Sequence, residues 1–168
     1  FINSCTVEVE TGGCLDAYAD NYNSNADYDD GSCLYTCLDP YATNYNITES
    51  YDICYYEADV VLFLDVAGAQ SLTNNGVPFL DVYVGNTHVG TMPADVGFAG
   101  VVLCDDVNPE PVHFTYEWED SQTSSLSWSV RDLSGTEWYN GTDVVIANNC
   151  LSLLLSNKKL QEYKEATK

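Results

Sequence analysis

The sequence predicts a mainly β protein: an antiparallel β-sandwich preceded by two small, loop-rich modules held by disulfides. Three observations lead to this prediction. Paired cysteines bracket a short acidic stretch that occurs twice, apolar and polar residues alternate from Ala58 onward, and seven cysteines are spread over 168 residues. We expect four parts: an N-terminal strand or linker (1–12), two tandem cysteine repeats (13–56), the sandwich (57–156) and a basic C-terminal tail (157–168).

The two cysteine repeats are copies of one another. When Cys37 is set over Cys14, eight of the first ten positions match, and Cys54 then closes the second copy two residues earlier than Cys33 closes the first. A unit of about 23 residues is too short to bury a sufficient apolar core, so such units depend on cross-links. The repeat therefore indicates two disulfide-bonded modules in an extracellular protein.

The first copy carries a full set of regularly spaced residues: Gly13, Cys14, Asp16, Ala19, Asn21, Tyr22, Ala26, Asp29, Asp30, Gly31, Ser32 and Cys33. This pattern resembles the G-C-x-D-x-x-A-x-N-Y-x-x-x-A-x-x-D-D-G-S-C repeats of secreted surface proteins of aquatic Bacteroidetes, most of which are large adhesins. The resemblance covers about 20 residues, or about 40 with the second copy, which lacks the Asp-Asp-Gly-Ser ending. It implies a surface location and a modular architecture, and it implies no reaction.

The sandwich is predicted from a period of two in the hydrophobic pattern. Residues 60–66 have apolar side chains on both faces and predict a strand buried on both sides. Hairpins are expected at Gly85-Asn86 and at Ser134-Gly135. The segments expected to form strands are 60–66, 79–84, 87–91, 101–103, 112–119, 126–131, 138–139, 144–146 and 151–155. We expect Trp118, Trp128 and Trp138 to be core residues rather than a sugar-stacking platform.

Seven cysteines favour an oxidising compartment. The repeat suggests the pairs Cys14–Cys33 and Cys37–Cys54, and Cys104 and Cys150 remain as a pair within the sandwich, although sequence alone does not fix connectivity. Cys5 is left over, either free, separated from its partner by processing, or linked to another subunit. A zinc site is disfavoured because the chain has no Cys-x-x-Cys pair.

The net charge of −21 excludes nucleic acid as a partner, because an acidic body repels phosphates. Arg131 is the only basic residue before Lys158, and all four lysines lie in the tail. The acidity is explained by solubility or by adaptation to salt, and the tail by a frayed end; alternatively, the tail docks on the acidic body of a neighbouring copy. No run of apolar residues is long enough for membrane insertion.

Calcium is the one cofactor that the sequence suggests, because carboxylates and amides crowd a single disulfide loop beside a turn-forming glycine. The expected ligands are Asp16, Asn21, Asp27, Asp29 and Asp30. The alternative is that these side chains only make turns and cap backbone amides. Two sequons, beginning at Asn46 and Asn140, are expected in loops and would carry glycans in a eukaryotic source.

No catalytic arrangement is evident, since neither His88 nor His113 lies beside a nucleophile motif, and we expect no enzyme activity. The first hypothesis is an extracellular structural protein, a subunit of a surface filament or adhesive assembly. Its copies would join through the basic tail, through the strand-like stretch 6–10 added to a neighbouring sandwich, or through both; the alternative for that stretch is pairing with its own sandwich. The second hypothesis is a carbohydrate-binding module of a secreted adhesin.

Overall fold

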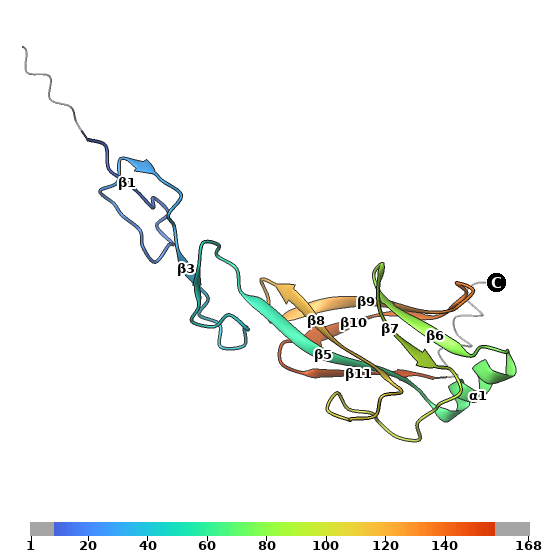
Figure 1. Ribbon diagram of the computed structural model, residues 1–168. Helices are drawn as coiled ribbons and strands as arrows, with labels where there is room; N and C mark the ends of the chain where they lie inside the picture. Colours follow the sequence, from blue (N-terminus) through green and yellow to red (C-terminus); the bar gives the residue numbers. More distant parts are fainter. Residues whose placement is uncertain (1–8, 157–168) are drawn as a thin grey trace, which may run out of the picture. The chain divides into compact units, whose positions relative to one another are not determined.

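The computed structural model describes residues 9–156, which fall into two compact units that meet in the sequence at Tyr55 and Tyr56 (Figure 1). The protein is mainly β, with small disulfide-bonded sheets in the first unit and a β-sandwich in the second, as the sequence predicts. The predictions for Cys5, most of the strand-like stretch 6–10 and the basic tail fall outside the described residues. Of that stretch only Val9 and Glu10 are described, and neither belongs to a strand.

The first unit contains four strands of two residues each. β1 (Gly12–Gly13) pairs in parallel with β2 (Tyr28–Asp29), and β3 (Tyr35–Thr36) pairs antiparallel with β4 (Thr48–Glu49). Among residues 9–55, the buried apolar side chains are small: Cys14, Ala19, Cys37 and Ala42. Such a set cannot supply the burial energy of a core, so covalent bonds and backbone hydrogen bonds hold this unit together.

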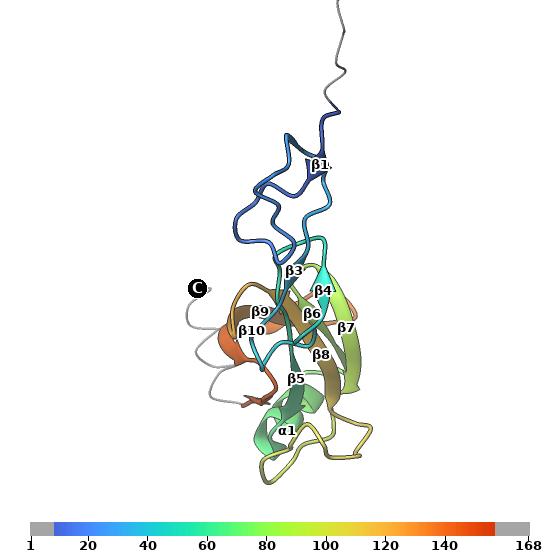
Figure 2. The ribbon, with the colours of Figure 1, turned by 90° about the vertical axis from the view of Figure 1, so that its left-hand side faces the viewer.

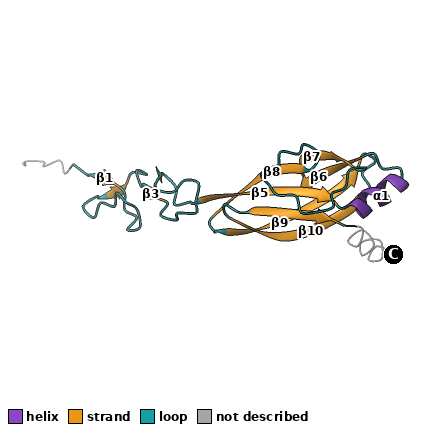
Figure 3. Cartoon of the chain, turned by 90° about the horizontal axis from the view of Figure 1, so that it is seen from below, coloured by secondary structure: helices purple, strands orange, loops and turns teal. Residues whose placement is uncertain are grey.

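The described part of the second unit, up to residue 156, contains seven strands and one helix, drawn in orange and purple in Figure 3. One sheet has the order β10-β9-β6-β7 and the other has the order β11-β5-β8. No helix among residues 9–156 has both the length and the hydropathy that a membrane span requires. The bounds are β5 (Tyr55–Leu64), α1 (Val66–Asn74), β6 (Phe79–Val84), β7 (Thr87–Pro93), β8 (Val112–Glu119), β9 (Thr123–Asp132), β10 (Glu137–Ile146) and β11 (Cys150–Leu155).

The core lies between these two sheets, because alternate residues of each strand face inward. Leu62 of β5, Leu80 of β6 and Leu126 of β9 are fully buried in it. β5 is buried on its other face as well, where Val61 and Phe63 join Val102 in a second, smaller cluster. The prediction of a strand with two buried faces is therefore confirmed.

Both predicted hairpins are present: β6 pairs antiparallel with β7 around Gly85, and β9 pairs with β10 around Gly135. Each of these glycines has a positive φ, of 56° and 87° respectively, which a side chain would strain. One pair departs from the antiparallel prediction, since β11 runs parallel to β5. Parallel strands cannot be joined by a tight turn. This pairing is possible because all the elements from α1 to β10 lie between β5 and β11 in the chain.

The strand expected over 60–66 ends earlier, at Leu64, and the helix that follows was not predicted. Asp65 is the N-cap of α1, and its carboxylate accepts a hydrogen bond from the Gly68 backbone N–H. An aspartate at this position satisfies one of the orphan amides of a helix start, which favours a helix from Val66 onward. The short run of residues after Asp65 lacks the apolar periodicity that would have revealed the helix.

The segment 101–103 was expected to be a strand and is instead part of a long connection between β7 and β8, coloured yellow in Figure 2. Of its three residues only Val102 is buried against the sheet, without strand pairing, whereas Val101 and Leu103 are exposed. Val102 packs on Val61 and Phe63, and its carbonyl accepts a hydrogen bond of 2.6 Å from the Ser152 hydroxyl. The connection thereby covers the outer face of β5, and the Cys104–Cys150 disulfide ties it to β11.

Two short strands expected over 138–139 and 144–146 form one continuous strand, β10. Gly141 lies between them, within the sequon that was expected in a loop. In the structure it is needed for a close approach, since a Cβ there would lie 2.7 Å from the ring of Trp128. The glycine makes room for the indole, so the strand continues without interruption.

The hairpin between β9 and β10 predicts a dependence of stability on pH. Hydrogen bonds from the Ser134 hydroxyl, and further ones from the Trp138 indole and the Thr136 and Ser134 amides, lower the pKa of Asp132 from 3.8 to about 2. A carboxyl whose pKa is lower in the folded state stabilises the fold above pH 4, and this contribution is lost as the pH falls toward 2. Urea unfolding at pH 5, 3 and 2 is therefore expected to show less acid sensitivity for Asp132→Asn than for the unaltered protein.

A second variant, Ser134→Ala, removes the strongest donor and keeps the carboxyl group. Its acid sensitivity is expected to lie between those of the other two proteins. If all three lose stability in parallel between pH 4 and 2, the assignment to Asp132 is wrong.

Candidate functional site

The disulfides Cys14–Cys33, Cys37–Cys54 and Cys104–Cys150 are all formed, which confirms the predicted pairs. They indicate an oxidising environment. We call residues 14–33 the first cysteine module and residues 37–54 the second. Each is closed by its own disulfide, with sequence separations of 19 and 17 residues.

The two modules share one hydrogen-bonded scaffold. In the first, the Asp16 carboxylate accepts from the Tyr18 amide at 2.9 Å, and the Cys14 carbonyl accepts from the Asn23 amide at 2.8 Å. In the second, residues 23 positions later repeat both contacts: Asp39 with Tyr41 at 3.0 Å, and Cys37 with Asn46 at 2.8 Å. The sequence repeat is thus a repeat of structure.

An asparagine clamps the closing cysteine of each module. The Asn21 side chain donates to the Ser32 carbonyl at 2.6 Å and accepts from the Leu34 amide at 2.8 Å, so it bridges the residues on either side of Cys33. Asn44 does the same around Cys54, donating to the Ile53 carbonyl at 2.9 Å and accepting from the Tyr55 amide at 3.0 Å. The two-residue deletion in the second module therefore falls between the asparagine and the cysteine, and the clamp survives it.

Removing the asparagine clamp is expected to destabilise the second module more than the first. Asn44 is only 6% exposed, so Asn44→Ala leaves the Ile53 carbonyl and the Tyr55 amide without partners in a site that water reaches poorly. We expect it to cost about 2–3 kcal/mol in the opening free energy of the second module. Asn21→Ala is the matched control at an exposed site, where water replaces the lost bonds and the cost is smaller. Amide hydrogen exchange measures both, and equal costs would contradict this reasoning.

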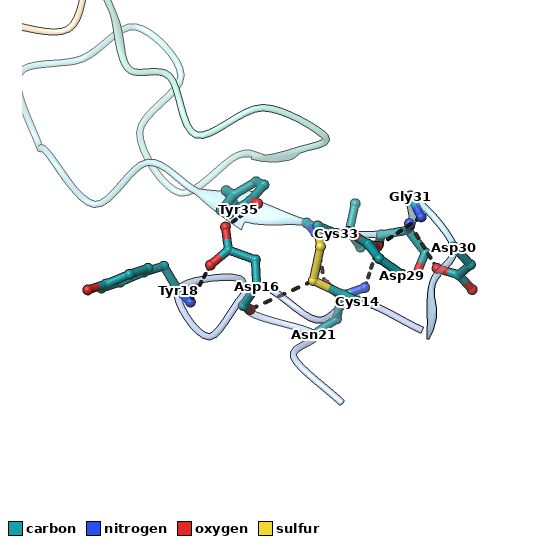
Figure 4. Close-up of a disulfide and its surroundings, with 11 residues drawn as sticks. Cys14, Asp16, Tyr18, Asn21, Asp29, Asp30, Gly31, Cys33 and Tyr35 are labelled. Carbon is teal, nitrogen blue, oxygen red and sulfur yellow. Dashed lines mark hydrogen bonds between the residues drawn. A yellow bond between two sulfur atoms is a disulfide. The ribbon is translucent and has the colours of Figure 1, made fainter. Parts of the chain in front are cut away.

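Among the expected calcium ligands, all of them described residues, no three of the aspartates are arranged to hold one ion. Figure 4 shows Asp16 on one side of the Cys14–Cys33 disulfide and Asp29 and Asp30 on the other. Within residues 9–156, no three or more His, Cys, Asp or Glu side chains are arranged to hold a metal ion. Calcium binding stays a prediction of the sequence alone.

These side chains do make the contacts of the alternative, turn formation and amide capping. Asp27 accepts from the Thr11 amide at 2.9 Å, and Asp29 and Asp30 accept from the Gly31 and Ser32 amides at 3.0 Å each. Such contacts between an aspartate and an amide two residues later are characteristic of turns.

Hydrogen bonds also set the charge states of this loop. The Tyr18 amide and, to a smaller extent, the Tyr35 hydroxyl lower the pKa of Asp16, and the bond to Asp16 raises the pKa of Tyr35. The Ser32 hydroxyl and amide lower the pKa of Asp30. Carboxylates that stay charged in this way keep the surface of the module negative.

Tyrosines make up six of the eleven large apolar residues that are exposed between residues 9 and 55. Six of the eight tyrosines between residues 9 and 55 are exposed: Tyr18, Tyr22, Tyr28, Tyr41, Tyr45 and Tyr51. Tyr18 is the most exposed, at 90%. Because the modules repeat, Tyr18 corresponds to Tyr41 and Tyr22 to Tyr45. We call these four residues the paired tyrosines.

The two sequons lie in different settings. Asn46 occupies a turn of the second module with a positive φ of 58°, and it is exposed, as expected. Asn140 was expected in a loop and lies within strand β10 instead, opposite Ser129 of β9. It is nevertheless exposed, because β10 is an edge strand and this position faces outward.

The three tryptophans contribute to the sandwich core, as predicted. Trp128 is buried in it, and its indole donates to Asp143 at 2.7 Å. Trp118 and Trp138 are half-buried and pack against the same cluster. Trp118 also stacks with Tyr56 and Tyr116.

Sequence reasoning missed a polar surface on the outer face of the four-stranded sheet. Cross-strand partners form two complete rows over this sheet. One row is Glu137, Arg131, Asp81 and Thr91, and the other is Asn140, Ser129, Tyr83 and His88. We call these eight residues the polar face.

Contacts join the polar face across all four strands. Glu137 accepts from Asn140 at 2.7 Å and lies 3.5 Å from the Arg131 guanidinium. Arg131 lies over the ring of Tyr83, 5.1 Å from its centroid, and the His88 ring packs on Tyr83 at 5.4 Å. Asp81 accepts from Thr91 at 2.6 Å and lies 3.3 Å from the His88 Nε2.

Only part of the polar face could be predicted from the sequence. The predicted hairpin at Gly85-Asn86 places Asp81 and Tyr83 near the residues of the next strand. The step from β6 to β9 joins strands that are not consecutive, and no local pattern reveals it.

No protein-family model, curated protein or solved structure matches this chain.

Proposed function

We propose that this protein is an extracellular, non-enzymatic structural protein of an adhesive surface assembly, and that its cysteine modules provide the contact surface between copies. The exposed tyrosines of the first unit are the observation that carries the proposal. The three disulfides support an extracellular location.

Tyrosine is well suited to making contacts between proteins. Its ring provides a large apolar area and its hydroxyl a hydrogen bond, at the entropic cost of only two side-chain torsions. For this reason tyrosine is enriched at protein interfaces and frequent among the residues that dominate binding. In the first unit the buried apolar residues are cysteine and alanine, so the exposed tyrosines are not part of that core.

The scaffold beneath the tyrosines is constrained. Each module has a disulfide, an asparagine clamp and aspartate-capped turns, repeated in both copies. A surface that is ordered before binding loses less conformational entropy on association. Two modules in tandem also present two similar patches, which favours multivalent contact.

Charge sets the conditions under which copies associate. Residues 9–55 contain nine acidic residues and no Lys, Arg or His, so two first units repel one another at low ionic strength. Salt screens this repulsion, with a Debye length of about 8 Å at 0.15 M. Association through tyrosines is therefore expected to strengthen with salt, whereas docking of the basic tail on an acidic body would weaken.

The test uses sedimentation velocity of the full chain over a range of concentrations, at 0.05 M and 0.5 M NaCl. The unaltered protein is expected to form oligomers whose proportion rises with concentration and salt. Replacing the paired tyrosines together (Y18S, Y22S, Y41S and Y45S) is expected to weaken association at least about tenfold.

The matched control replaces two exposed apolar residues of β10, Val144→Ser and Ile146→Ser, and is expected to associate like the unaltered protein. Mass spectrometry under non-reducing conditions verifies that the disulfides remain. A protein that stays monomeric at every concentration and salt, or a tyrosine variant that associates normally, would overturn the proposal. Assembly through the terminal segments is then the prediction left to examine.

A further inference from the structure

We infer that the polar face of the four-stranded sheet is a binding site for a neutral saccharide. This inference concerns the second unit alone and is independent of the tyrosines of the first. It rests on the difference between the two outer faces of the sandwich, on the chemistry of the polar face, and on one buried hydroxyl.

One outer face of the sandwich is covered by a connecting segment, and the other outer face carries the polar residues. On the sheet β11-β5-β8, the connection between β7 and β8 covers Val61 and Phe63, and a disulfide fixes that connection in place. On the sheet β10-β9-β6-β7, the two rows of the polar face lie on the outside, with half-exposed Arg131 and Tyr83 near their centre. The second sheet is therefore the one that offers a surface.

The groups on this surface match the needs of a sugar. Saccharide hydroxyls donate to carboxylates and accept from guanidinium and amide N–H groups, and the C–H faces of the ring pack on flat side chains. Asp81 and Glu137 supply carboxylates, Arg131 and Asn140 supply donors, and the Arg131–Tyr83 pair supplies a flat centre.

The surface is organised before any ligand binds. Thr91 and His88 hold Asp81, while Asn140 and Arg131 hold Glu137, so neither carboxylate has to be fixed at the moment of binding. A ligand that uses such groups loses less affinity to the ordering of side chains.

Ser129 provides a further observation. It lies in the middle of the second row, between Tyr83 and Asn140, and only 8% of its surface is exposed. Its hydroxyl has no hydrogen-bond partner among the described residues, although buried polar groups nearly always have one. A ligand hydroxyl at the centre of the polar face reaches this oxygen only when the side chains that cover it move aside.

Charge favours a neutral sugar over an acidic one. Arg131 is the only Lys or Arg between residues 9 and 156, and Asp81 and Glu137 flank it on the same sheet. With a net charge of −21 over the chain, a polyanion such as a uronate polymer is repelled. A glycan on Asn140, whose amide already bonds Glu137, would block the same surface.

The experiment measures binding of the full chain to a panel of polysaccharides by affinity electrophoresis and calorimetry. The panel consists of mannan, xyloglucan, laminarin, soluble chitin oligomers and polygalacturonate. We expect binding to at least one neutral member. Arg131→Met keeps the aliphatic stem over Tyr83 and removes the donors, and we expect it to weaken that binding at least about tenfold.

Asn140→Ala, at an exposed position, is a second variant expected to weaken binding, and it is less able to disturb folding. The matched control is Glu117→Gln, an exposed carboxylate on β8 of the other sheet, which is expected to bind normally. Thermal unfolding verifies that all three variants are folded. The inference is overturned if no neutral member binds, if only polygalacturonate binds, or if the Arg131 and Asn140 variants bind like the unaltered chain.

Discussion

Replacing Cys14 and Cys33 together with serine is expected to unfold the first cysteine module while the β-sandwich stays folded. The disulfide closes a loop with a sequence separation of 19 residues, and in the chain-entropy view such a bond contributes about 3 kcal/mol. Little apolar burial remains to stabilise the module after this loss, because Ala19 is its one buried apolar residue besides cysteine. The asparagine clamp depends on the position of Cys33 and is lost with it.

Amide hydrogen exchange followed by mass spectrometry measures this effect by region. The Asn23 and Leu34 amides, which donate to Cys14 and Asn21, are expected to lose their protection. Amides in β5 and β9 are expected to keep it, because the sandwich forms a compact unit of its own. Protection of Asn23 and Leu34 at the original level would show that the module folds without its cross-link.

Replacing Trp128 with alanine is expected to have the largest effect in the sandwich, about 3–5 kcal/mol in the free energy of unfolding. The indole is only 3% exposed, it packs over Gly141, and it donates a hydrogen bond of 2.7 Å to Asp143. Its removal leaves a cavity lined in part by a glycine, which has no side chain to fill it. Asp143 also loses a partner at a half-buried position.

Equilibrium unfolding in guanidinium chloride measures this cost, and two variants serve as controls. Trp128→Phe retains most of the volume and loses the hydrogen bond, so its cost is expected to be smaller. Trp138→Ala removes a half-buried indole that bonds Asp132 near the hairpin, and it is also expected to cost less. If Trp128→Ala costs no more than Trp138→Ala, Trp128 does not have the central place assigned to it.

The two parts of the chain differ in how the sequence encodes them. In the first unit the information is local: cysteines, asparagines and aspartates specify contacts within about 20 residues, and the same letters recur in the second copy. In the sandwich, the identity of most strands is local but their arrangement depends on pairings between distant segments. The candidate sites inherit this difference, because the tyrosines follow from the repeat and the polar face follows from the sheet.

The sequence by itself determined the mainly β class, the two hairpins and the double burial of β5, and it suggested the three disulfide pairs that the structure then confirmed. Each of these depends on spacing, alternation or a glycine in a turn, which are properties of short stretches. The tertiary structure alone decided that β11 runs parallel to β5, that Val102 covers a sheet rather than extending one, and that Gly141 makes room for the Trp128 ring within a strand. It also decided that Asp16 lies on the opposite side of the Cys14–Cys33 disulfide from Asp29 and Asp30, and that Arg131 lies over Tyr83. These outcomes depend on which distant segments pack together, and the free energy of such packing cannot be deduced from local patterns.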